Sequence, residues 1–249
     1  MNRLRKIISA LMFSLMLITC SFASPVFAAD RGIENINSST MLLPTPKIYT
    51  NSLESEQKSL PNGVPIIVTP YYDKVKVWVG NVGADSLDSV TVLGTATDYG
   101  TLKAQTSSVP PVVGKTFTWY VPQTKCLMEY KITIVIQDAG QTVTKNGYAT
   151  LEYTEAQLAS VGWHRGTRPT RVKSLEYHFD THKSEIGAKN ICAYINSAIT
   201  TKNHALQSPS KYNITVSTQG TQGHKYKHKT SGIFIILADS NNEMLSHGR

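Results

Sequence analysis

Alternation of apolar and polar residues dominates residues 64–155. β-Branched or aromatic side chains occupy every second position in several short segments, at 75–79, 90–92, 117–121 and 132–136. A period of two is typical of strands that bury one face. Turn signals separate these segments, at 83–85, 99–100, 110–111, 114–115, 138–140 and 146–147. Six or seven short strands in about 90 residues predict an all-β antiparallel sandwich.

The pattern changes after residue 172, where helical spacing precedes further strands. Leu175, Phe179 and His182 share one face of a predicted helix over residues 174–182, and an apolar stripe marks a second helix over 188–200. Strands follow, at 212–216, 224–229, 233–237 and 243–247. Residues 173–249 are therefore predicted as a small α+β domain with two helices and then an antiparallel sheet, joined to the sandwich by a linker at 156–172.

The N-terminus has the features of an export signal. Basic residues at 3–6 precede an apolar stretch at 7–22, and Val26-Phe27-Ala28 is a small-x-Ala cleavage sequence. We expect a signal peptide over residues 1–28, a secreted extracellular protein, and no stable membrane insertion after cleavage. A retained anchor and lipidation of Cys20 are the alternatives. Residues 29–63 lack periodicity, which predicts a flexible mature N-terminus.

Two cysteines remain after signal cleavage, Cys126 and Cys192. Export permits a disulfide, whereas the apolar surroundings of Cys192 favour two free, buried thiols. Asp73, Asp85 and Asp88 lie in or near the predicted turns, where turn capping and cation binding are both open.

Charge is divided unevenly along a chain of net charge +8. Residues 163–249 carry 12 Lys and Arg against five Asp and Glu, and also all seven histidines, whereas residues 30–162 carry 10 against 12. A hydrophobic content of 41% excludes general disorder. A basic, histidine-rich module favours polyanionic partners, nucleic acid above all, although the charge could serve solubility alone.

Candidate chemistry lies in this basic region. His178 and His182 are one helical turn apart, so their imidazoles can converge and serve as acid or base near neutral pH. The predicted strand 224–229 places His224, Tyr226 and His228 on one face and its lysines on the other. The histidine pair lacks the Glu of His-Glu-x-x-His and an evident third ligand, so we predict no metal and no cofactor. A core-edge role for His182 and a solvated lysine face are the structural alternatives.

Two parts of the chain resemble known families. Residues 80–90 and 113–119 resemble bacterial extracellular immunoglobulin-like domains. The sequence Tyr177-His178-Phe179-x-x-His182-Lys183-x-Glu185-Ile186-Gly187-Ala188-Lys189, with the terminal strands, resembles the C-terminal tips of bacterial polymorphic toxins. Those tips are placed with the barnase–EndoU–colicin–RelE group of metal-independent ribonucleases. This chain departs from their pattern at Lys183-Ser184, where Gly is usual, and at its terminal Ser246-His247-Gly248.

The resemblance implies RNA cleavage by attack of the 2′-hydroxyl. That reaction needs a base, an acid and a cation at the phosphate. The acid–base candidates are His182, His178 and His228. The candidates for binding phosphate or RNA are Lys225, Lys227, Tyr226, Thr230 and Ser246. We expect a monomer whose partner is RNA or another polyanion, with an immunity protein as a candidate second partner. The rival hypothesis is a non-enzymatic adhesion or envelope-binding protein with a basic tip.

Overall fold

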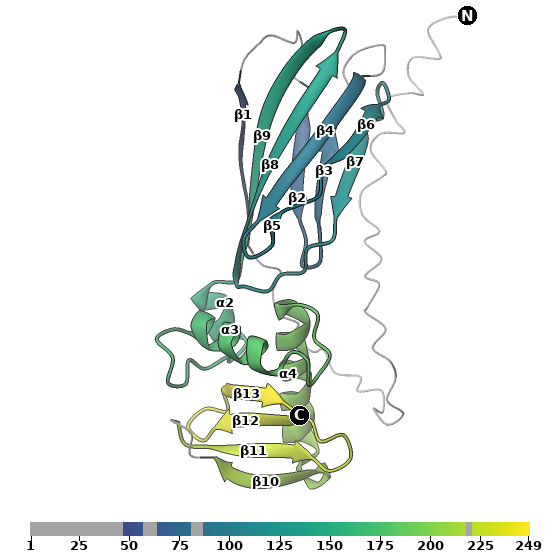
Figure 1. Cartoon of the computed structure of the whole chain (residues 1–249). Coiled ribbons are helices and arrows are strands. Elements are labelled where there is room, and N and C mark those ends of the chain that lie inside the picture. The colour runs from purple at the N-terminus through teal and green to yellow at the C-terminus, as the bar shows by residue number, and fades with distance from the viewer. Residues whose placement is uncertain (1–46, 57–63, 81–86, 218–220) are drawn as a thin grey trace, which may run out of the picture. The chain divides into compact units, whose positions relative to one another are not determined.

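The computed structural model describes residues 47–56, 64–80, 87–217 and 221–249 (Figure 1). Over these residues the protein is rich in antiparallel β-sheet and has a smaller region that combines helices with a sheet. The predicted signal peptide, residues 1–28, lies outside the described residues, as do Asp85 and the predicted turn at 83–85. None of the described helices has the length and apolar character needed to cross a bilayer.

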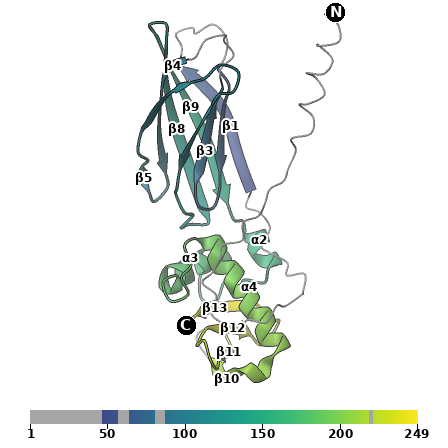
Figure 2. The same cartoon turned by 90° about the vertical axis from the view of Figure 1, so that its right-hand side faces the viewer.

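The first part of the chain forms two antiparallel sheets. Its strands are β1 (Lys47–Glu56), β2 (Ile66–Pro70), β3 (Val75–Val79), β4 (Leu87–Ala96), β5 (Gly100–Thr101), β6 (Gln105–Val109), β7 (Lys115–Trp119), β8 (Leu127–Asp138) and β9 (Gln141–Glu152). Among the described residues one sheet has the order β1-β9-β8-β4-β5, with β6 paired to β4, and the other has the order β2-β3-β7. The predicted alternation is confirmed, because every second residue of β3 and β8 is buried over most of each strand. These residues join one core shared by both sheets, which lie face to face (Figure 2).

Two predicted turns had different outcomes. The turn at 138–140 is confirmed: Ala139 and Gly140 have positive φ, and the Asp88 carboxylate accepts a hydrogen bond from the Ala139 N–H at 3.0 Å. This contact supports the capping interpretation of Asp88. The predicted Asn146-Gly147 turn was wrong, because both residues lie inside β9. Pairing with β8 on one side and β1 on the other overrides the local turn preference.

The segment predicted as a flexible N-terminus contains an edge strand. β1 pairs antiparallel with β9, from Lys47 opposite Glu152 to Glu56 opposite Thr144. Its sequence has few apolar residues in alternation, and the partner strand lies almost 100 residues away, so no local signal marked it. The rest of that predicted segment, residues 29–46 and 57–63, lies outside the described residues.

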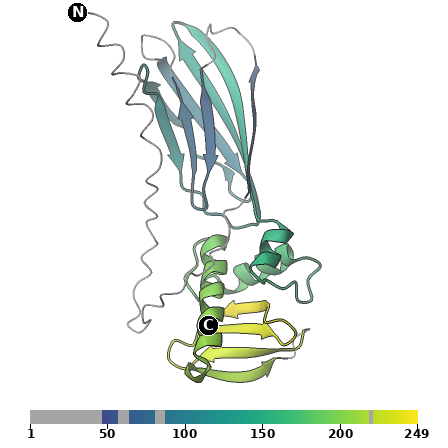
Figure 3. The ribbon, with the colours of Figure 1, turned by 180° about the vertical axis from the view of Figure 1, so that it is seen from behind.

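The second part has the predicted order of helices followed by a sheet. Its elements are α2 (Glu155–Ser160), α3 (Arg171–His182), α4 (Ile191–Gln207), the 3-10 helix η1 (Pro209–Lys211), β10 (Tyr212–Ser217), β11 (Gly223–His228), β12 (Phe234–Ala238) and β13 (Met244–Gly248). The sheet has the order β10-β11-β12-β13 and is antiparallel throughout. α4 crosses one face of it (Figure 3).

The predicted linker at 156–172 is largely structured. It contains most of α2. A capping box between Thr154 and Gln157 stabilises the start of that helix. The predicted linker also contains Trp163, which is fully buried. The Glu155 carboxylate accepts hydrogen bonds from the N–H groups of Arg171 and Val172, at 3.0 and 2.8 Å, and so caps α3.

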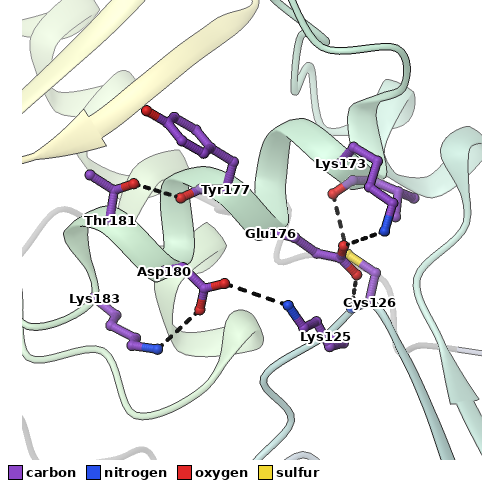
Figure 4. Close-up of polar contacts among 9 residues, drawn as sticks. Lys125, Cys126, Lys173, Glu176, Tyr177, Asp180, Thr181 and Lys183 are labelled. Carbon is purple, nitrogen blue, oxygen red and sulfur yellow. Dashed lines mark hydrogen bonds and ion pairs between the residues drawn. The ribbon is translucent and has the colours of Figure 1, made fainter. Parts of the chain in front are cut away.

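Two residues of the first part, one before β8 and one after β9, belong to the core of the second. Cys126 and Tyr153 are buried in the same cluster as Leu175 and Tyr194. Glu176 on α3 accepts a hydrogen bond from the Cys126 N–H at 3.1 Å (Figure 4). Cys126 and Cys192 are both free thiols, so the free-thiol interpretation is confirmed, although Cys192 is only partly buried. Because Cys126 and Tyr153 belong to this second core, the packing of the helical region depends on the residues before it.

Substitution Glu176→Ala is expected to destabilise the chain by about 1–3 kcal/mol, because it leaves the buried Cys126 N–H without its acceptor. The matched control is Lys173→Ala, which removes only the exposed ion-pair partner of Glu176 (3.0 Å). The control should cost less than about 1 kcal/mol. Urea unfolding of both variants measures the difference, and equal losses would contradict this role of Glu176.

Candidate functional site

The sheet β10–β13 has one face covered by α4 and one face that carries the polar candidates. His247 lies on the α4 side, where its Nε2 is 2.9 Å from Ser197 Oγ. Neighbouring residues of a strand point to opposite faces, so Ser246 and Gly248 lie on the other face. The pairing register extends this face across the sheet, through Ile236 and Phe234 to Lys225 and Lys227. We call it the open face because α4 leaves it uncovered, and its β13 end, with Ser246, Phe234 and Gly248, is buried against α3 and the turn after it.

A row of aromatic rings runs along α3 to the open face. We define this aromatic row as Tyr177, His178, His182 and Phe234. Successive ring centroids are 5.1, 6.0 and 5.8 Å apart, and the two imidazoles are nearly parallel, at 9°. A cation lies over each end: the Arg168 guanidinium is 3.7 Å from the centroid of Tyr177, and Lys225 Nζ is 3.8 Å from that of Phe234. The predicted convergence of His178 and His182 is confirmed.

His178 is partly buried and hydrogen-bonded. Its Nδ1 is 3.2 Å from Ser246 Oγ, and the ring of Trp163 packs against it at 6.0 Å. Burial lowers the pKa of His178 to about 4, and the positive charges of His182 and Arg168 act in the same direction. His178 is therefore neutral at pH 7 and can accept a proton.

His182 is held by a carboxylate. Its Nδ1 is 3.0 Å from Glu185 Oε2, and the same oxygen accepts a hydrogen bond from the Arg249 N–H at 2.9 Å. The Arg249 hydrogen bond is the largest cause of a lowered Glu185 pKa, with His182 and Lys225 adding to it. An ionised carboxylate at Nδ1 orients the imidazole and leaves Nε2 for a substrate.

Gly248 allows the His182–Glu185 pair to approach β13. A Cβ at this position would lie 2.8 Å from both His182 Nδ1 and Glu185 Oε2, and 2.9 Å from the Phe234 ring. Any larger residue would displace the pair or the strand.

His228 lies in a different cluster, on the α4 side of the sheet. Its ring centroid is 5.1 Å from that of Tyr212 and 5.7 Å from that of His204. Its Nδ1 accepts a hydrogen bond from the Ser231 N–H at 3.2 Å. Tyr226 has the same orientation, with its ring 6.4 Å from that of Tyr212. The predicted alternation along this strand is confirmed, and for that reason these two candidates do not join the histidine pair.

Of the remaining candidates, two lie at the aromatic row and two are exposed elsewhere. Ser246 and Lys225 contact members of the aromatic row, as described above. Lys227 is exposed on the open face, and Thr230 is exposed in the turn after β11. Within the described ranges no three His, Cys, Asp or Glu side chains are grouped as a metal site would require.

Five residues of the site were not among the sequence candidates: Arg168, Tyr177, Glu185, Phe234 and Gly248. Glu185 had a usable signal, because it follows His182 by three residues. Arg168 had none, since only the fold brings the loop before α3 over Tyr177. The arrangement offers a neutral imidazole, a carboxylate-bound imidazole and cations within one row, which is suited to proton transfer beside an anionic substrate.

Comparison with known proteins assigns no family. No protein-family model and no curated protein matches the sequence. The geometry of the described residues is therefore the basis for a proposal about function.

Stability is expected to fall as the pH falls from about 6.5 toward 4. His247 is fully buried, its Nδ1 is 2.8 Å from the Phe234 carbonyl oxygen, and burial lowers its pKa to about 4. A histidine whose pKa is lower in the folded state binds its proton more readily when unfolded, so stability is complete above the unfolded value and is lost with acid. His178 acts in the same direction.

The test is thermal unfolding between pH 7.5 and 4.5. His247→Gln should be less stable at pH 7.5 but lose less stability on acidification than the wild type. Identical pH slopes for the two proteins would contradict the assignment.

Substitution Gly248→Ala is expected to destabilise the chain by about 1–3 kcal/mol, because the added methyl group overpacks the contact with His182 and Glu185. Ser246→Ala on the same strand adds no volume and is the control for it. Urea unfolding gives the stability, and the imidazole NMR signals of His182 report displacement. If neither the stability nor the His182 signal changes, Gly248 is not in tight contact with His182 and Glu185.

Proposed function

We propose that this chain cleaves RNA by metal-independent transesterification at the aromatic row. The single observation that carries the proposal is the parallel pair of imidazoles, His178 and His182, with centroids 6.0 Å apart in a row with a cation at each end. Two adjacent proton-transfer groups and a cation are the requirements of this reaction.

In the proposed step the 2′-oxygen attacks phosphorus and the bond from phosphorus to the 5′-oxygen breaks. The products are a 2′,3′-cyclic phosphate and a free 5′-hydroxyl. His178 takes the proton of the 2′-hydroxyl, because its low pKa keeps it neutral, and His182 gives a proton to the leaving 5′-oxygen. Glu185 acts as a positioning residue that holds His182 through Nδ1.

Lys225 is the proposed electrostatic partner of the phosphate. It lies over Phe234, the last ring of the row, on the open face that also carries Ser246. A fixed ammonium at this place stabilises the charge that develops on the phosphorane oxygens. Lys227 lies two residues further along β11 on the same face. Its charge extends the positive surface toward the neighbouring phosphates of the RNA.

The first part of the chain has a supporting role in this proposal. We propose that residues 64–155 are an immunoglobulin-like domain, on the basis of two antiparallel sheets around one core. The chain would be exported by residues 1–28, and the α+β region would then act on RNA outside the producing cell.

A second candidate is a polyanion-binding protein without catalysis. Two observations favour this candidate. Lys227 is exposed on the open face, and residues 163–249 carry 12 Lys and Arg against five Asp and Glu. In that case RNA or an anionic wall polymer would bind the open face and remain intact.

The test uses the purified full chain with end-labelled RNA in EDTA. Wild type should produce 2′,3′-cyclic phosphate ends, and His182→Ala should cleave about 10²- to 10⁴-fold more slowly, the usual contribution of an acid–base group. His178→Ala should show a comparable loss. The matched control is His224→Ala, which removes an imidazole paired with Asp239 on the other side of the sheet.

Salt-sensitive RNA binding without cleavage by the wild type would support the second candidate and overturn the first. Equal cleavage by the wild type and both α3 histidine variants would also overturn it. Thermal unfolding of each variant shows whether a loss reflects the site or the fold.

A further inference from the structure

Tyr177 and Arg168 form an exposed planar surface at the end of the aromatic row. The Arg168 guanidinium lies 3.7 Å above the Tyr177 ring, and the tyrosine side chain is 46% exposed. Tyr177 points away from the side of α3 that holds Glu176 and Asp180 (Figure 4). Its ring forms a T-shaped pair with His178, with centroids 5.1 Å apart and planes at 77°. The surface therefore adjoins a histidine that we assign to proton transfer.

The loop that carries Arg168 is fixed to the same strand as Ser246. Met244 of β13 donates its N–H to the Gly162 carbonyl at 2.6 Å and accepts a hydrogen bond from the His164 N–H at 2.9 Å. Arg171 pairs with Glu243 at 3.4 Å. Arg168 itself donates its N–H to the Arg165 carbonyl at 3.0 Å. Arg168 and the histidine pair are thus anchored to one sheet edge, which lowers the entropic cost of binding there.

We infer that Tyr177 and Arg168 are a stacking platform for an unpaired nucleobase next to the scissile phosphate. The inference rests on the proposed function and specifies its substrate as single-stranded RNA. Aromatic rings and guanidinium planes are the surfaces on which proteins stack unpaired bases. A paired base inside a duplex has no free face to offer, so double-stranded RNA is excluded from the platform.

The position of Tyr177 suits base stacking better than that of Tyr226, the aromatic residue among the RNA-binding candidates from the sequence. Tyr226 packs toward Tyr212 on the α4 side of the sheet, on the other face from Lys225. Tyr177 instead lies beside His178, within one ring contact of the proposed chemistry. A nucleotide stacked on Tyr177 can therefore place its phosphate at the histidine pair.

The test measures binding of the full chain to a fluorescent 2′-O-methyl oligonucleotide, which cannot be cleaved. Tyr177→Leu should weaken binding about 5- to 150-fold, the range seen when a stacking side chain is removed. Tyr177→Phe should bind like the wild type, because the ring is retained. The control is Tyr120→Leu, which removes a 76% exposed tyrosine that also has a lysine near its ring and that directly follows β7.

Oligonucleotides with one abasic position complete the design. The abasic position that weakens binding to the wild type most marks the stacked base. That oligonucleotide should bind Tyr177→Leu no more weakly than the intact oligonucleotide does, because both changes remove the same stacking contact. Equal affinity of wild type and Tyr177→Leu would overturn the platform, as would additive losses.

Failure of the platform is distinguishable from failure of the proposed function. If the wild type cleaves RNA in EDTA but Tyr177→Leu binds the oligonucleotide equally well, the proposed function is supported and the stacking platform is overturned. Tyr177-dependent binding without any cleavage would keep the platform as a single-strand binding site and remove the catalysis.

Discussion

The close approach of α3 and its C-terminal turn to β13 is the constraint on which the candidate site depends. At Gly248 there is no room for a side chain, because His182 and Glu185 occupy the space that a Cβ would need. Two residues earlier, Ser246 meets His178. The buried Trp163 packs against His178 and bridges to Met244 at the start of the same strand, so the loop before α3 is fixed to it as well. One strand therefore sets the positions of both imidazoles.

This arrangement gives two neighbouring histidines different environments. His178 lies between Trp163 and His182, where burial opposes a positive charge, and its pKa is about 4. His182 faces Glu185, a carboxylate kept ionised chiefly by the Arg249 N–H. Pairs of titratable groups that the fold places in contrasting surroundings are suited to opposite roles in proton transfer. The proposed division between base and acid follows from this contrast.

Part of the site could be predicted from sequence because it depends on local geometry. The four-residue spacing of His178 and His182 brings two rings together on any helix, and alternation along β11 separates Lys225 from Tyr226 and His228. Nothing in the sequence showed which face of that strand α3 would meet, so His228 was grouped with the α3 histidines although it packs against Tyr212.

Long-range pairing explains what the sequence did not reveal. β1 and the Asn146-Gly147 segment of β9 are strands because other strands pair with them, against their local preferences. Arg168 reaches Tyr177 only through the folded loop between Trp163 and α3. The order of the helices and strands after residue 172 was recoverable because period and turn signals are local, whereas the residues that complete the site are distant in the chain.

The most direct measurement of the central claim follows the histidine side chains themselves. Proton–nitrogen NMR spectra of the imidazoles would be recorded for the full chain while a DNA dinucleotide, which lacks the attacking 2′-hydroxyl, is added. The account predicts that the signals of His178 and His182 shift together and saturate at one concentration, while those of His204 and His228 stay in place. Shifts confined to His204 and His228, or the absence of any shift in the α3 pair, would contradict it.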